Sequence, residues 1–161
     1  MEDKINTLKC EIKKLKNCKY NKPITTYKLI YQENRDNKMY NALLFDNDYD
    51  DLLSDKELKP FIYLNSKCKY IINYSITLDV VHDGHFQCSF LLGTKDGKKF
   101  KIIKGSKTIC NQSHAIGKQI IINNSILYET DTKVEIFMIC CFDETKVKFS
   151  CDKSILKYTT I

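Results

Sequence analysis

The sequence predicts a mostly β fold: an antiparallel β-sandwich with one short helix, in a single domain over residues 1–161. Three observations lead to this prediction. Short runs that alternate apolar and polar residues recur along the chain. Two Asp-Gly pairs, at Asp83-Gly84 and Asp96-Gly97, separate such runs and are typical of hairpin turns. Many short strands joined by polar turns are characteristic of sandwiches and barrels.

The first third of the chain contains one ambiguous segment and two strands. Residues 5–20 fit a helix, with apolar residues spaced three and four apart, and equally fit a strand by local alternation, so both assignments stay open. Asn21-Lys22-Pro23 then interrupts the chain. Residues 24–31 and 39–45 are expected to be strands, separated by a polar turn at residues 32–37.

The single helix is expected within the acidic stretch of residues 46–59. Ser54-Asp-Lys-Glu57 has the spacing of a capping box, in which the Ser hydroxyl and the Glu carboxylate satisfy free N–H groups at a helix start. From Phe61 onward the pattern indicates β structure. Residues 69–81 and 86–92 are expected to pair as a hairpin through Asp83-Gly84.

The C-terminal half repeats this pattern. Asp96-Gly97 is expected to form a second hairpin into residues 99–104, and residues 105–117 are expected to form a loop. Alternating runs predict three more strands, at residues 118–128, 133–142 and 145–149.

Composition restricts the class of protein. A chain of 161 residues with 43% hydrophobic and 29% charged residues has a normal globular composition. The longest apolar run, Ile136 to Phe142, is too short to span a bilayer. Met1-Glu-Asp-Lys leads into a lysine-rich segment without the apolar core of a secretory signal, so we expect a cytoplasmic protein without a membrane partner.

The eight cysteines are expected to be reduced thiols in that compartment. Cys140 and Cys141 are adjacent in a strand, so their side chains should lie on opposite faces. His82, His85 and Cys88 form the grouping that most resembles a zinc site. The two histidines flank the expected hairpin turn, however, and Cys88 alternates with Phe86 and Phe90 and should face the core. We therefore expect no metal and no other cofactor.

Enzymatic activity is not expected. The chain has five glycines and no glycine-rich phosphate loop, and no local signature pairs a cysteine with a histidine. The carboxylates of Asp50 and Asp51 are explained by the start of the expected helix, where negative charge is favourable. A small-molecule substrate is therefore not expected.

Lysine supplies almost all of the positive charge in a chain of net charge +6, which favours an anionic partner. One group of lysines lies near the N-terminus and another around the second expected hairpin. Phe100 and Tyr20 are interleaved with them and are candidates for base stacking. Edge strands also use exposed lysine to prevent aggregation, so both interpretations stay open. The groups comprise Lys13, Lys14, Lys16, Lys19 and Lys22, and Lys95, Lys98, Lys99, Lys101, Lys104 and Lys107.

Five stretches, in order along the chain, resemble the CxxC-motif-containing zinc-binding proteins, a eukaryotic family of formerly unknown function. "KINTLKCEIKKLKNCKYNKP" resembles the first strand of the family, and "TTYKLIYQENRDNKMYNALLFDND" resembles its next hairpin, whose turn normally carries the first Cys-x-x-Cys. "YLNSKCKYIINYSITL" resembles the start of the strand with the second Cys-x-x-Cys. "GHFQCSFLLGTKDGKKFKI" and "KQIIINNSILYETDTKVEIFMICC" resemble a later strand and the last strand pair.

The chain departs from this family at the metal ligands. Gln32 and Arg35 stand where the first cysteine pair belongs, and Ile71 replaces the partner of Cys68. One thiolate cannot hold structural zinc, which needs four ligands. The resemblance therefore identifies Cys68 as a vestigial ligand, and we expect packing of Ile71 to compensate for the lost metal.

Zinc-less members of this kind are similar to dormancy factors of microsporidia, which associate with inactive ribosomes. The resemblance implies a ribosome-binding protein that blocks a tRNA site sterically, through contacts with rRNA and ribosomal proteins. Two alternatives stay open: an OB-like protein that binds single-stranded nucleic acid, and a non-enzymatic adaptor for protein partners. The residues expected to contact rRNA are Lys13, Lys14, Lys16, Lys98, Lys99, Lys101 and Lys104.

Overall fold

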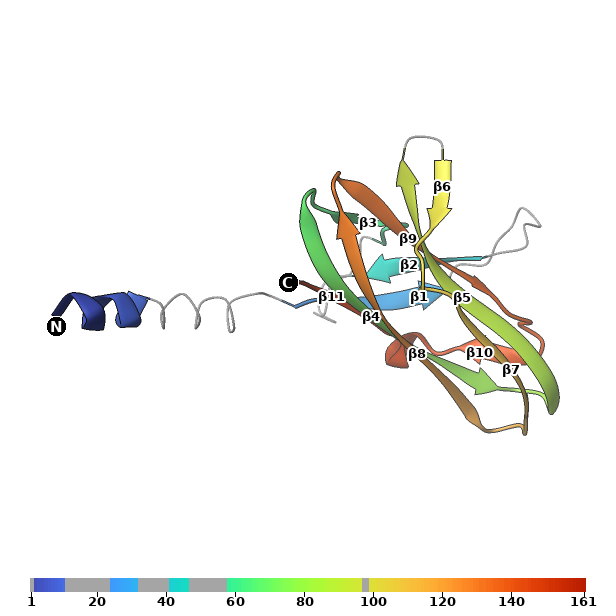
Figure 1. The fold of residues 1–161 in the computed structure, drawn as a ribbon. Helices are drawn as coiled ribbons and strands as arrows, with labels where there is room; N and C mark the ends of the chain where they lie inside the picture. Colours follow the sequence, from blue (N-terminus) through green and yellow to red (C-terminus); the bar gives the residue numbers. More distant parts are fainter. Residues whose placement is uncertain (1, 11–23, 32–40, 47–57, 97–98) are drawn as a thin grey trace.

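The structure, a computed structural model, describes residues 2–10, 24–31, 41–46, 58–96 and 99–161. Eleven antiparallel strands form one continuous sheet that folds over on itself into two layers (Figure 1). The mostly β, antiparallel sandwich expected from the sequence is therefore confirmed. The strands are β1 Thr25–Tyr31, β2 Asn41–Asp46, β3 Ile62–Leu64, β4 Cys68–Val80, β5 Gly84–Asp96, β6 Lys99–Ile102, β7 Thr108–His114, β8 Gln119–Thr130, β9 Val134–Cys141, β10 Val147–Phe149 and β11 Ile155–Thr160.

The first layer is built around β4, whose 13 residues make it one of the two longest strands. One edge of β4 pairs with β8 from Cys68↔Thr130 to Asp79↔Gln119. The other edge pairs with β11 over residues 70–75 and with β10 over residues 78–80. β11 then pairs with β1, which extends the layer.

The second layer is built around β9. One edge of β9 pairs with β5, and the other pairs with β2 and β3. The other edge of β5 pairs with β7 near the start of β5 and with β6 near its end. Pairing of β1 with β2 joins the two layers into one sheet.

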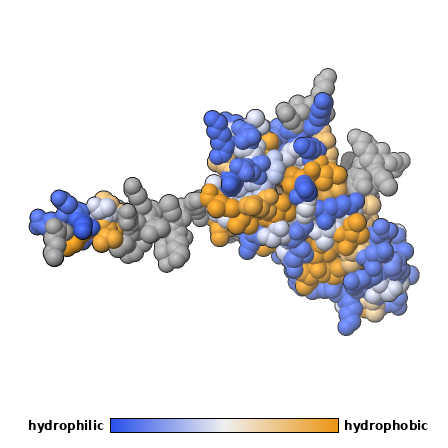
Figure 2. Space-filling model, in the orientation of Figure 1, coloured by the Kyte–Doolittle hydropathy of each residue, from blue (hydrophilic) through white to orange (hydrophobic). Residues whose placement is uncertain are grey.

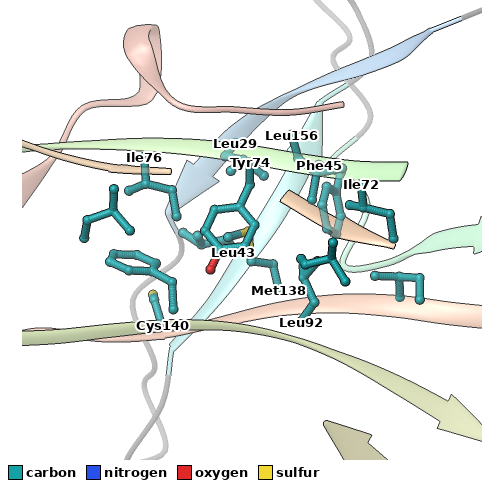
Figure 3. Close-up of a cluster of buried hydrophobic side chains, with 14 of the residues drawn as sticks. Leu29, Leu43, Phe45, Ile72, Tyr74, Ile76, Leu92, Met138, Cys140 and Leu156 are labelled. Atoms are coloured by element: carbon teal, nitrogen blue, oxygen red, sulfur yellow. The ribbon is translucent and has the colours of Figure 1, made fainter. Parts of the chain in front are cut away.

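The core lies between the layers and follows from strand alternation. Along β4, every second residue is buried, including Ile72, Tyr74 and Ile76. From the opposite layer, Leu92 of β5 and Met138 of β9 are fully buried and contribute to the same core (Figure 3). Alternate side chains of a strand point to opposite faces, so this pattern fixes which residues face inward.

Two strand assignments from the sequence are corrected. The Asp83-Gly84 pair does not close a hairpin, because both edges of β4 are occupied by other strands and β5 pairs in the second layer. The chain crosses between layers here, and Gly84 has a φ of 134° as β5 begins, a conformation that favours glycine. Residues 105–117 are not entirely a loop, since Thr108–His114 form the edge strand β7.

The pairing expected for the second hairpin is confirmed, because Asp96 pairs with Lys99 and β6 continues along β5. Residues 97–98 lie outside the described residues. A strand absent from the sequence assignment, β11, follows a 3-10 turn, η1 Cys151–Lys153. Its Leu156 faces the core, and its alternation is interrupted after Tyr158 by two threonines.

The open choice for the N-terminal segment is resolved for its first part, because residues 2–10 are helical. This helix lies apart from the sandwich in Figure 1, and all nine residues are exposed. The helix expected around Ser54 to Glu57 falls outside the described residues. Among the described residues, no helix is both long and apolar enough to cross a bilayer.

Candidate nucleic-acid interface

Three of the seven lysines expected to bind RNA are described, and they lie at one place in the fold. Lys99 and Lys101 are on β6, and Lys104 is in the turn that follows it. All three side chains are exposed. Lys13, Lys14, Lys16 and Lys98 lie outside the described residues.

Lys95 and Lys107 extend this group. Lys95 is near the end of β5, and Lys107 precedes β7, and both are exposed. We call these five lysines the basic edge: Lys95, Lys99, Lys101, Lys104 and Lys107. The ion pairs within 4.0 Å found in the described part of the chain are Lys28–Asp152, Lys69–Glu129 and Lys146–Asp143, so none involves the basic edge.

The lysines of β6 do not share a face with Phe100. Lys99 and Lys101 alternate with Phe100, so strand geometry directs them to opposite sides. The ring of Phe100 covers Gly93 on β5, where a Cβ atom would overlap it. It also packs edge-on against Phe137 of β9, with ring centroids 6.4 Å apart. Of the basic edge, Lys95 lies directly opposite Phe100 in the pairing of β5 with β6.

Ser106 fixes the turn that carries Lys104 and Lys107. Its side chain is fully buried, and its hydroxyl donates to the carbonyl oxygen of Leu92 at 2.9 Å. The oxygen of the Ser106 hydroxyl in turn accepts the N–H of Leu92 at 3.0 Å. The Ser106 hydroxyl therefore bonds to the β5 backbone at Leu92, which follows the residues of β5 that pair with β7 and precedes those that pair with β6. Lys104 and Lys107 consequently project from an anchored turn.

A second set of hydrogen bonds holds the same turn from the first layer. The Tyr74 hydroxyl donates to the carbonyl oxygen of Ser106 at 2.7 Å and lies 2.6 Å from the Thr108 hydroxyl. The Asn124 amide donates to the carbonyl oxygen of Gly105 at 3.0 Å. Burial raises the pKa of Tyr74, which keeps this hydroxyl neutral and able to donate. The turn is therefore bonded to both layers.

The histidines and Cys88 do not form a metal site in the described residues, where no group of three potential ligands is close enough to hold an ion. Cys88 is buried in the core, as expected from its alternation with Phe86 and Phe90. Its pKa is raised to about 12 by burial and by the neighbouring Cys110 thiol. His85 instead contacts the Asn111 side chain on β7.

Cys68 is half-buried at the start of β4, where it pairs with Thr130. Gln32 and Arg35 lie outside the described residues. The expectation for Ile71 is corrected: its side chain is on the outer face of β4 and is 36% exposed, so it contributes little to the core. Cys140 is buried and Cys141 is half-buried, as expected for neighbours on opposite faces.

One further feature was missed from the sequence: apolar side chains on the outer face of the second layer. Tyr63 and Phe100 are exposed, and Phe61 and Phe137 lie between them. Ring centroids are 5.0 Å apart for Phe61 and Tyr63 and 5.6 Å apart for Phe61 and Phe137. We call these four residues the aromatic face. Alternation around Phe137 is visible in the sequence, but which partner strands complete the surface depends on the fold.

Comparison with known proteins shows the fold alone. No protein-family model matches the chain. No curated protein matches it either. A crystal structure of murine APRIL at pH 8.0 is similar, with a TM-score of 0.53, 7% sequence identity, and coverage of 86% of this chain and 100% of that chain. A second crystal structure of murine APRIL, at pH 8.5, has a TM-score of 0.48 and 8% identity over 86% of this chain and 100% of that chain.

Proposed function

We propose that the protein is a non-enzymatic, cytoplasmic RNA-binding factor that occupies a tRNA site on the ribosome and acts as a dormancy factor. The basic edge would supply its rRNA contacts. The observation that carries the proposal is the concentration of five exposed lysines around β6 and the adjoining turn. Lysine contacts a phosphate as a point charge and needs no bidentate geometry, so this arrangement suits a nucleic-acid backbone.

The anchored turn favours binding over simple edge protection. Lysines on β6 itself also discourage edge-to-edge pairing of sheets, so Lys99 and Lys101 have two possible roles. Lys104 and Lys107 lie outside the strands, and the buried Ser106 hydroxyl between them holds their turn to β5. A fixed turn presents charge at lower entropic cost than a mobile one.

Co-sedimentation with purified ribosomes tests the proposal. The variant K99Q/K101Q/K104Q removes three charges from the basic edge. A matched control removes three charges elsewhere, at the exposed Lys118, Lys148 and Lys153. Each phosphate contact contributes about 0.7 to the slope of log K against log salt concentration. At 0.1 M salt, which is one logarithmic unit below 1 M, a lost contact therefore lowers log K by about 0.7, and three lost contacts lower affinity about a hundredfold. Equal losses in the two variants, or ribosome binding by neither the variants nor the natural chain, would contradict the proposal.

The aromatic face supports a second candidate function, that of an adaptor for a protein partner. Tyr63 is 64% exposed and Phe100 is 47% exposed, and contiguous exposed rings are typical of protein interfaces. The OB-like alternative has less support, because the sandwich has eleven strands rather than the five of that barrel.

The same experiment separates the two candidates. Y63S/F100S leaves every lysine in place and removes the two most exposed rings. An adaptor loses its partner in this variant and keeps it in the lysine variant. A ribosome-binding factor that uses the basic edge shows the opposite result.

A further inference from the structure

The outer face of the first layer carries exposed aliphatic side chains. Leu127 of β8 lies directly opposite Ile71 of β4, and Thr159 of β11 pairs with Ile71 on its other side. Ile161 continues beyond β11, with its N–H donating to the carbonyl oxygen of Lys69 at 2.9 Å, and Ile24 directly precedes β1. We call Ile24, Ile71, Leu127 and Ile161 the aliphatic row. Leu127 is 69% exposed and Ile24 is 64% exposed.

The aliphatic row borders an open hollow of about 550 Å³ on the same face. In the next two rows of the sheet, β4 and β8 present only asparagine and serine, which are shorter than the flanking aliphatic side chains. The surface is therefore a groove with an apolar border, a shape that suits an amphipathic helix. Its outer lining consists of Asn73, Ser75, Asn123, Ser125, Ile155 and Lys157.

The N-terminal helix is an amphipathic segment without a partner in the described part of the chain. Ile5 and Leu8 are three residues apart, so they lie on one face, and they are 49% and 57% exposed. A nine-residue helix is below the length at which an isolated helix is stable in water. Packing of its apolar face is the usual source of stability for such a segment.

We propose that the aliphatic row is the docking surface for the N-terminal helix of the same chain, with Ile5 and Leu8 against Leu127 and Ile71. Ile24 belongs to the row and is also where the described chain enters the sandwich. Figure 2 shows that the surface of the sandwich carries hydrophobic areas among the hydrophilic ones. The helix and Ile24 are separated by 13 residues, 11–23, which reach up to about 45 Å when extended. The tether therefore reaches the row and gives the helix a high local concentration.

The surrounding charges agree with this pairing. Lys9 directly follows Leu8 on the helix. Glu129 is two residues beyond Leu127 on the same face of β8, and its contact with Lys69 is long, at 4.0 Å. Docking of Leu8 on Leu127 places a lysine near this carboxylate.

Amide hydrogen exchange of residues 2–10 in the full chain, combined with analytical ultracentrifugation, tests the proposal. We expect the natural chain to be protected about tenfold or more relative to the variant L127D, which leaves the helix sequence unchanged. L8D should remove protection equally. The control I109D places the same charge at a 55% exposed position of β7 in the other layer and should retain protection.

Three results would overturn the proposal. The first is exchange of residues 2–10 at the rate of an unstructured peptide in the natural chain. The second is protection that survives in L127D, or is lost equally in I109D. The third is protection that disappears on dilution together with a dimer, because the helix would then dock on a second copy.

Discussion

Replacing Ser106 by alanine is expected to destabilise the protein, because the buried hydroxyl serves two backbone groups. It accepts the N–H of Leu92 at 3.0 Å and donates to the carbonyl oxygen of Leu92 at 2.9 Å. The carbonyl oxygen keeps a second donor in S106A, the N–H of Ile103 at 2.9 Å. The N–H of Leu92 loses the oxygen to which it donates, at a residue that is fully buried.

An unsatisfied buried donor costs about 1–3 kcal/mol, which sets the expected loss in the free energy of unfolding. For a chain of this length each kcal/mol corresponds to about 2–4 °C in Tm, so the melting temperature should fall by about 2–12 °C. Urea denaturation measures the free energy directly, and the midpoint should fall while the m-value stays constant.

The control for S106A is S113A. Ser113 is exposed, and its hydroxyl lies 3.4 Å from the Nδ1 atom of His85, so its removal should change stability by less than about 0.5 kcal/mol. An equally small change in S106A would refute the reasoning, because it would show that the hydroxyl of Ser106 is not the partner on which the Leu92 backbone depends.

Two further predictions follow from pKa values. Burial and the Cys110 thiol raise the pKa of Cys88 to about 12. Mass spectrometry after iodoacetamide treatment of the folded protein at pH 8 should therefore find Cys88 unmodified and the exposed Cys10 modified. Equal labelling of the two cysteines would contradict this prediction. The Thr145 hydroxyl and N–H donate to Asp143 and lower its pKa, so this carboxylate stabilises the fold above the ordinary carboxyl pKa of about 4, and the contribution is lost as pH falls. Urea midpoints from pH 7 to pH 2 should therefore decline less in D143N, and an unchanged decline would exclude this role.

The alternation of apolar residues predicted most strands from sequence, and it placed Cys88 in the core with Phe86 and Phe90, where all three are buried. The run of residues 69–81 was expected to be a strand, and β4 covers Cys68–Val80 with Ile72, Tyr74 and Ile76 buried. Such patterns report which residues face inward, and they carry no information about which strand lies alongside. The short polar strand β7 was missed, because an exposed edge strand needs little apolar alternation.

The Asp83-Gly84 turn shows why pairing was harder to predict. The pair is a strong local hairpin signal, yet the edges of β4 are taken by strands distant in sequence. The Asp83 carboxylate instead accepts the N–H of Ile116 at 2.6 Å, which ties the crossing to the turn before β8. Long-range pairing outweighed the local preference.

The lysines of the candidate site were selected from the sequence, and their surroundings come from the structure. The grouping of Lys99, Lys101 and Lys104 followed from their closeness in sequence. Anchoring of their turn by Ser106 and Tyr74 could not be foreseen, because it depends on contacts between strands far apart in the chain. The separation of Phe100 from the lysines follows from strand alternation once β6 is assigned.

The salt dependence of ribosome binding tests the central claim most directly. The measurement is the slope of log K against log salt concentration for the natural chain and for K99Q/K101Q/K104Q. If these lysines contact rRNA phosphates, the slope should become shallower by about 2, or about 0.7 for each lost contact, while K118Q/K148Q/K153Q keeps the natural slope. An unchanged slope in K99Q/K101Q/K104Q would contradict the assignment of the basic edge as an RNA-binding surface.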